Sequence, residues 1–133
     1  MGTRSLTRVF EDGQQVVNMY RQFDGYPSGH GKELFDFLDG LVVVNGLSGG
    51  PDKRIANGAG CLAAQLVSHF KTEPGGIYLV TGSPGNHGQE YEYQVRCNFA
   101  TKDVNIVVKN YRKKVLFEGS VADFGIFCDK EDE

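Results

Sequence analysis

A chain of 133 residues is the size of one ordinary domain and can bury a core without metals or disulfides. Its net charge of −3 disfavours a protein whose main partner is nucleic acid. Three cysteines without a Cys-x-x-Cys pair, no apolar signal region and no run of about 20 apolar residues together predict a soluble intracellular protein without a membrane span.

The first half of the chain predicts a hairpin, a helix and a short strand. Residues 5–10 have strand character, Asp12-Gly13 marks a tight turn, and residues 15–23 form the returning strand. After a turn over residues 24–28, apolar side chains at helical spacing over residues 34–38 predict a helix that Gly40 ends. Residues 41–44 then predict a buried extended segment, followed by an Asn45-Gly46 turn.

The second half begins with the clearest helix. Asn57 is a suitable N-cap, and the core-facing stripe consists of Ala59, Leu62, Ala63, Leu66, Val67 and Phe70. The pattern then changes to strands at residues 77–80, 91–99, 104–109 and 115–118, the second of them half-buried and antiparallel. A last short element over residues 121–127 precedes an acidic, frayed tail at residues 129–133.

This order of elements predicts a single α+β domain over residues 1–133, with a mostly antiparallel sheet and two helices packed on one face. No internal repeat or linker interrupts it.

The densest group of chemically capable side chains lies between residues 20 and 34. Gly29 and Gly31 flank the first turn of the first helix, where about four backbone N–H groups lack helical partners and can bind an anion. Arg21, His30 and Lys32 would add charge. Tyr20 and Tyr26 could stack on a base or sugar. The plainer alternative is a tight strand-to-helix turn with Ser28 as N-cap.

The second helix opens in a similar way, because Lys53-Arg54 precedes a glycine-rich start at Asn57. If both starts faced one cleft, two positive dipole ends would converge on one acidic ligand. The alternative is simple capping and close packing of the helix on the sheet. The candidate ligand-binding residues are Arg21, Asp24, Tyr26, Ser28, Gly29, His30, Gly31, Lys32, Arg54 and Asn57.

Cofactor and metal signatures are not found. Five residues rather than four separate Gly25 from Gly31, and Glu33 stands where a Walker loop needs Ser or Thr. The three histidines match no zinc spacing, so neither a metal nor a cofactor is expected. Asp24 and His30 could form a base-and-orienter pair, which leaves a small phosphoesterase-type hydrolase as an alternative, although a turn is the commoner role for Asp24.

Three segments together carry a family resemblance: MGTRS at residues 1–5, YRQFDGYPSGHG at 20–31 and NGAGCLAAQL at 57–66, with residues 90–93 and 116–120 also fitting. They resemble small uncharacterised proteins of large double-stranded DNA viruses, Marseillevirus-like giant viruses among them, and of some tailed phages. The resemblance implies no activity and no catalytic residue. It implies a protein of the host cytoplasm or of the virion, with a role in host takeover or in the particle.

The leading hypothesis is a viral, non-catalytic binding protein for an anionic, nucleotide-like small molecule or a host factor, with its site at the two helix starts. A virion or protein-interaction component, which could be a homodimer, is the alternative. The hydrolase is the third reading. Nucleic-acid binding through Lys53-Arg54 and Arg112-Lys113-Lys114 is the fourth, and the net charge disfavours it.

Overall fold

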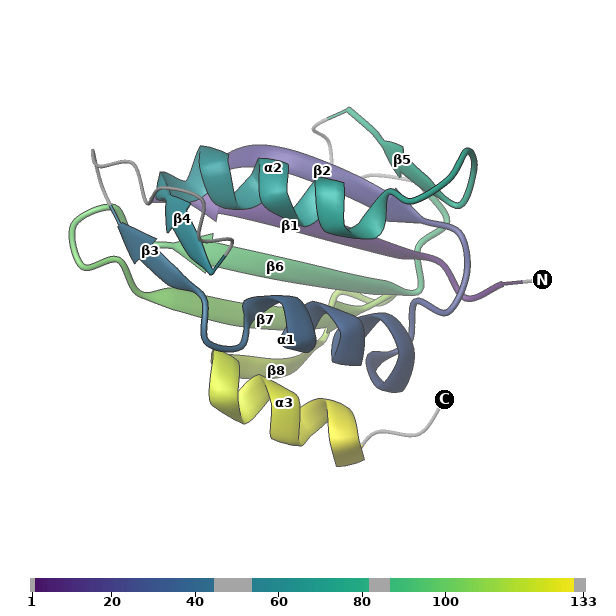
Figure 1. The fold of residues 1–133 in the computed structure, drawn as a ribbon. Helices are drawn as coiled ribbons and strands as arrows, with labels where there is room; N and C mark the ends of the chain where they lie inside the picture. The colour runs from purple at the N-terminus through teal and green to yellow at the C-terminus, as the bar shows by residue number, and fades with distance from the viewer. Residues whose placement is uncertain (1, 45–53, 82–86, 131–133) are drawn as a thin grey trace.

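The protein is a mostly antiparallel sheet covered on one face by helices, as seen in a computed structural model that describes residues 2–44, 54–81 and 87–130 (Figure 1). The strands are β1 (Ser5–Glu11), β2 (Gln14–Arg21), β3 (Val42–Val44), β4 (Ile55–Asn57), β5 (Ile77–Leu79), β6 (Tyr91–Cys97), β7 (Val104–Asn110) and β8 (Val115–Ser120). The helical elements are a π-helical turn η1 (Pro27–Gly31), α1 (Lys32–Leu38), α2 (Gly58–Phe70) and α3 (Val121–Lys130). The predicted α+β class is therefore confirmed.

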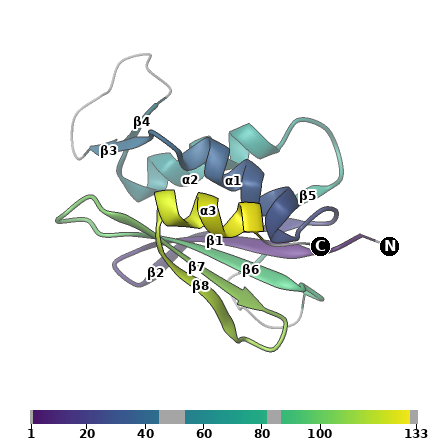
Figure 2. The same ribbon diagram turned by 90° about the horizontal axis from the view of Figure 1, so that it is seen from below.

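The main sheet has the strand order β5-β2-β1-β6-β7-β8 in the described part of the chain. Neighbouring strands are antiparallel except β1 and β6, which run parallel. Figure 2 shows α1, α2 and α3 together on one side of this sheet. The molecule therefore has two layers, a sheet and a layer of helices on one of its faces.

The core lies between the sheet and the helices, because alternate strand residues and one stripe of each helix are apolar. The α2 stripe is confirmed: Ala59, Leu62, Ala63, Leu66 and Phe70 are all buried. They pack in one cluster with sheet residues Val9, Met19, Tyr93, Val95, Ile106 and Val108, with Leu34, Phe37 and Leu38 of α1, and with Phe124 and Cys128 of α3.

The last short element, predicted over residues 121–127 without a type, is a third helix that extends to Lys130. Val121, Phe124, Gly125 and Cys128 follow the i, i+3, i+4, i+7 spacing of a helix face, and the last three are buried. Asp129 and Lys130 belong to this helix instead of a frayed tail. Residues 131–133 lie outside the described residues.

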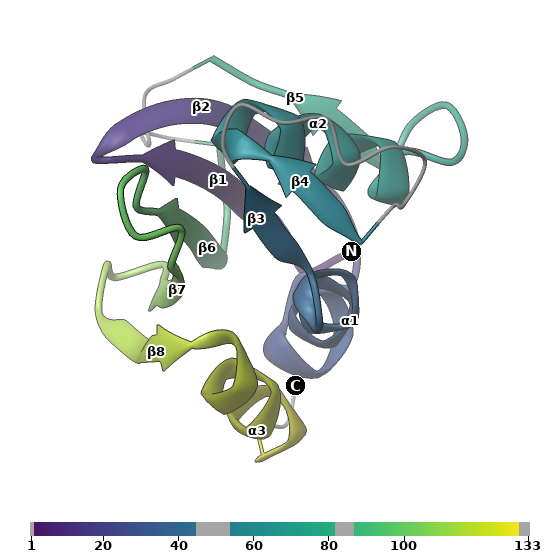
Figure 3. The same ribbon diagram turned by 60° about the vertical axis from the view of Figure 1, so that its left-hand side comes forward.

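The segment predicted as a buried strand at residues 41–44 is also corrected. Val42–Val44 pairs in parallel with Ile55–Asn57 as a separate two-stranded sheet. Figure 3 shows β3 and β4 side by side, apart from the main sheet and next to the start of α2. Val42 is 55% exposed, whereas Val43 packs against the core and Ala56 of β4 is buried within it, so the segment is only partly buried. The predicted Asn45-Gly46 turn and Lys53 lie outside the described residues.

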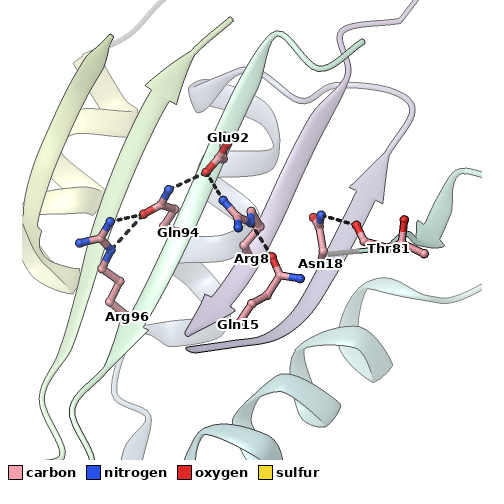
Figure 4. Close-up of polar contacts among 7 residues, drawn as sticks. All are labelled: Arg8, Gln15, Asn18, Thr81, Glu92, Gln94 and Arg96. Carbon is pink, nitrogen blue, oxygen red and sulfur yellow. Dashed lines mark hydrogen bonds and ion pairs between the residues drawn. The ribbon is translucent and has the colours of Figure 1, made fainter. Parts of the chain in front are cut away.

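β6 is more deeply buried than predicted. Its alternation of apolar and polar residues predicts a strand with one buried and one exposed face. Glu92 and Gln94 are buried although they lie on the face opposite the helices. Figure 4 shows the reason, a polar network in which Arg8 Nη1 donates to Glu92 at 2.9 Å and Arg96 Nε donates to Gln94 at 2.9 Å. Arg8 Nε also donates to Gln15 of β2 at 2.7 Å, so the network ties β2, β1 and β6 together.

The remaining strand predictions, namely the β1–β2 hairpin, β5 and the β7–β8 hairpin, are confirmed to within a few residues. Within the described residues, no helix is both long and apolar enough to cross a bilayer.

Candidate functional site

The two helix starts do not share a hollow. Figure 1 shows α2 beginning beside β4 and ending toward β5, whereas α1 follows η1 at the other side and ends toward β3. The two helices are thus antiparallel, and the start of α1 lies beside the end of α2. The expected convergence of two positive dipole ends is wrong, because the topology places those ends on opposite sides of the molecule.

The backbone amides of Gly29, His30 and Gly31 already have partners within the turn. Gly29 N donates to Tyr26 O at 3.0 Å, His30 N donates to Asp24 O at 2.7 Å, and Gly31 N donates to Tyr26 O at 3.4 Å. Tyr26, not Ser28, occupies the N-cap position, and no side chain caps the turn. The prediction of Ser28 as N-cap is wrong, since the π-helical turn starts two residues earlier, at Pro27, and closes on carbonyl groups instead.

The glycines of this turn allow the protein to pack on itself. A Cβ added to Gly31 would lie 2.9 Å from Cys128 Sγ and 3.4 Å from the Tyr93 ring. A Cβ added to Gly29 would lie 2.6 Å from Asp24 O. These close approaches explain why glycine is needed here without any ligand.

The proposed base-and-orienter pair of Asp24 and His30 is not formed. Asp24 has a positive φ of 61°, which suits its role in the turn. Its carboxylate accepts a hydrogen bond from Tyr26 Oη at 3.2 Å, and only its carbonyl meets the His30 backbone. The hydrolase alternative therefore loses the geometry on which it depended.

His30 is instead a buried structural link between β1 and Arg21. Arg21 Nη1 lies 3.1 Å from His30 Nδ1, and because a guanidinium can only donate, Nδ1 must accept. Nε2 then carries the proton and donates to Thr7 Oγ1 at 2.6 Å. The ring is fully buried between Phe70 and Tyr93, so desolvation, with the nearby Arg21 charge, lowers the pKa of His30 to about 3. His30 is thus neutral and out of reach of a substrate.

Arg21 is held at the edge of a hollow by these contacts. Its Nε donates to Phe23 O at 2.6 Å, and its Nη1 pairs with Glu33 at 2.8 Å. The Arg21 side chain is 15% exposed, and its Nη2 has no hydrogen-bond partner among the described residues. The guanidinium is therefore fixed in orientation but keeps one donor group for another molecule.

The hollow beside it, here called the Arg21 pocket, has a volume of about 460 Å³. It lies between the end of β2, the start of α1 and the segment from α2 to β5. Its lining comprises Arg21, Phe23, Glu33, His69, Phe70, Thr72, Glu73, Pro74, Gly75, Gly76 and Ile77. One guanidinium and two carboxylates give this pocket both signs of charge.

A second hollow, here called the Arg54 pocket, adjoins the first at His69 and has a volume of about 540 Å³. Phe37, Arg54, Ala64, Gln65, Ser68 and His69 line it. The His69 ring lies 5.2 Å from that of Phe37 and 5.1 Å from that of Phe70, so the histidine stands between aromatic neighbours belonging to the two pockets. We call the two pockets together the α1–α2 groove.

Of the ten candidate residues, only Arg21 and Arg54 line this groove. Lys32 pairs with Asp129 of α3 at 2.5 Å, and that hydrogen bond raises the pKa of Lys32. Asn57 is at the N-cap position of α2, as predicted, but its side chain does not cap the helix. The other lining residues were not predicted as members of a binding site. Antiparallel packing of α1 and α2 brings them together, and spacing within one segment does not reveal that packing.

The groove offers binding groups of three kinds. Guanidinium groups suit phosphate or carboxylate, carboxylates suit hydroxyl or amine donors, and ring faces suit a flat heterocycle. Within the described residues, no group of three or more His, Cys, Asp or Glu side chains could hold a metal ion.

Comparison of the chain with family models, curated proteins and solved structures finds no match. The site must therefore be interpreted from its own geometry.

Proposed function

We propose that the protein binds a nucleotide-like small molecule in the α1–α2 groove and does not transform it. One observation carries this proposal: two adjoining hollows share His69, and each of them is lined by an arginine. Together they offer about the volume that a drug-sized or nucleotide-sized ligand needs.

The charge balance narrows the ligand class. Glu33 and Glu73 offset Arg21 in its pocket, so a ligand that presents only negative charge there would meet repulsion. A nucleotide matches both signs, because its phosphate accepts from a guanidinium while its hydroxyl and amino groups donate to carboxylates. Its base would lie against the Phe37 and His69 rings.

The family resemblance to viral proteins gives this binding a purpose within the proposal. A viral protein that holds a host signalling nucleotide without hydrolysing it would remove that signal from the infected cell. A virion or protein-interaction role remains the alternative. A hydrolase is not favoured, since the Asp24–His30 pair on which it rested is not formed.

The direct test is a panel of mono-, di- and cyclic nucleotides, scored by the shift in thermal unfolding temperature and then by calorimetric titration. At least one nucleotide is expected to raise the unfolding temperature in a concentration-dependent way, because a ligand that binds the native state stabilises it. The recovered ligand is expected to be chemically unchanged. A panel without any shift would contradict the proposal, and recovery of a product would replace binding by catalysis.

Variants locate the binding. Arg54→Gln and His69→Ala are each expected to raise the dissociation constant roughly tenfold or more. The first removes a charged hydrogen-bond donor and the second removes a ring surface. The matched controls are Arg112→Gln and His87→Ala, which lie outside the groove. Equal affinity in the groove variants and the controls would place the ligand elsewhere.

A further inference from the structure

A third hollow lies on the other flank of α2, and we call it the α2–β2 groove. Its volume is about 570 Å³. The lining is mostly apolar and comprises Val16, Val17, Gly60, Ala63, Ala64, Val67, Ser68, Lys71 and Leu79. Only Ala64 and Ser68 are shared with the α1–α2 groove, so the two surfaces can be tested separately.

The groove exists because small side chains occupy much of its α2 wall and its outer strand β5 is short. A Cβ added to Gly60 meets nothing within 4 Å, so the α2 side is open there. β5 pairs only with Met19, Tyr20 and Arg21 of β2, and Val80 N bonds to Asn18 O. Among the described residues, the outer edge of β2 therefore has no strand beside residues 14–17.

A bulge in β2 adds to the apolar character of the groove. Val9 pairs with Val17 and Phe10 pairs with Gln15, so Val16 is an extra residue in the ladder. As a result, two consecutive valines line the groove, and Val16 remains 42% exposed. Leu79 at the end of β5 is 61% exposed. A surface strand would normally place a polar residue at one of two consecutive positions.

The occupant can be inferred from these features. An edge of β2 that no described strand covers, beside an apolar groove and a helix, suits an extended backbone, which hydrogen-bonds to the edge and inserts alternate apolar side chains. Lys71 is the charged lining residue, and it lies at the end of α2. A negative group on the occupant near that end would be attracted.

We propose that the α2–β2 groove binds an extended segment of a partner protein, apolar at alternate positions and acidic near Lys71. A second copy of this chain fits less well. In a two-fold dimer the same patch meets itself, and two facing concave surfaces would enclose a void rather than pack.

The test uses a fluorescein-labelled peptide of alternating valine and threonine with an aspartate at each end, titrated with the full chain. Saturable binding is expected in fluorescence anisotropy. Gly60→Leu fills the groove and Leu79→Asp charges its rim, so each is expected to weaken binding about tenfold or more. Gly60→Leu should keep or raise the unfolding temperature, because its Cβ enters open space and leucine favours helix more than glycine.

The matched control is Ile126→Asp, since Ile126 is 53% exposed on α3, away from the groove, and should leave peptide affinity unchanged. A peptide with lysine ends should bind more weakly than the aspartate form. No saturable binding, or equal binding by Gly60→Leu, would overturn the proposal. A dimer in sedimentation that Leu79→Asp dissociates would also overturn it, because the occupant would be a second copy.

Discussion

Arg21 owes its position to a histidine that solvent does not reach. The bond from Arg21 to His30 Nδ1 and the bond from His30 Nε2 to Thr7 fix one tautomer of the ring. Any proton added to His30 would have to break the contact with Arg21 and bring two positive charges together in a buried site. The orientation of a groove-lining cation therefore depends on a neutral histidine.

This contact predicts a pH dependence of stability. The pKa of His30 is lowered to about 3 in the folded protein from an ordinary value of 6.5, so the unfolded chain binds the extra proton first as the pH falls. The stabilisation is fully present above pH 6.5 and is lost as the pH falls toward 3. In this window the free energy of unfolding should fall by up to about 1.4 kcal/mol per pH unit because of His30.

Urea unfolding of the wild type and of His30→Gln at several pH values isolates this contribution, because acidic groups affect both chains alike. The variant should show a shallower dependence of the free energy of unfolding on pH than the wild type. If His30→Gln does not fold, an NMR titration of the wild-type imidazole replaces it. A His30 signal that titrates near pH 6.5 would contradict the account.

At the scale of elements, glycines in two helical elements have opposite roles. Gly31 is buried where η1 meets α3 and β6, and an added Cβ would lie 2.9 Å from Cys128 Sγ. Gly60 in α2 faces open space.

Urea unfolding of the two alanine variants tests this difference. Gly31→Ala should destabilise the fold by about 1–3 kcal/mol, as overpacking does. Gly60→Ala should stabilise it by up to about 1 kcal/mol, because alanine favours helix. Equal effects of the two substitutions would show that Gly31 is not a packing contact.

Elements with a clear period were predictable from sequence. The α2 stripe and the β7–β8 hairpin follow from spacing and turn residues alone. The helix α3 was missed although Val121, Phe124 and Cys128 have helical spacing, because Gly125 and the acidic tail resemble an irregular end. The burial of Glu92 was not predictable, since it depends on Arg8 from a strand far away in sequence.

At the scale of the whole molecule, the candidate site was only partly predictable. Arg21 and Arg54 were chosen because each precedes a helix, and both line the α1–α2 groove. Their partners were not predicted to join them in the groove, because Glu33 and His69 come from the beginning of one helix and the end of another. Which helix ends meet is decided by the path of the chain over the sheet, and local sequence patterns do not specify that path.

The path of the chain over the sheet thus creates the α1–α2 groove, and the nucleotide should bind in this groove and nowhere else. The most direct measurement is an NMR titration of the isotope-labelled protein with the nucleotide that gives the largest thermal shift. The account predicts that the largest amide shifts fall at Arg21, Glu33, Arg54 and residues 64–76. Largest shifts in the turn at residues 111–114, or no shifts at a saturating nucleotide concentration, would contradict it.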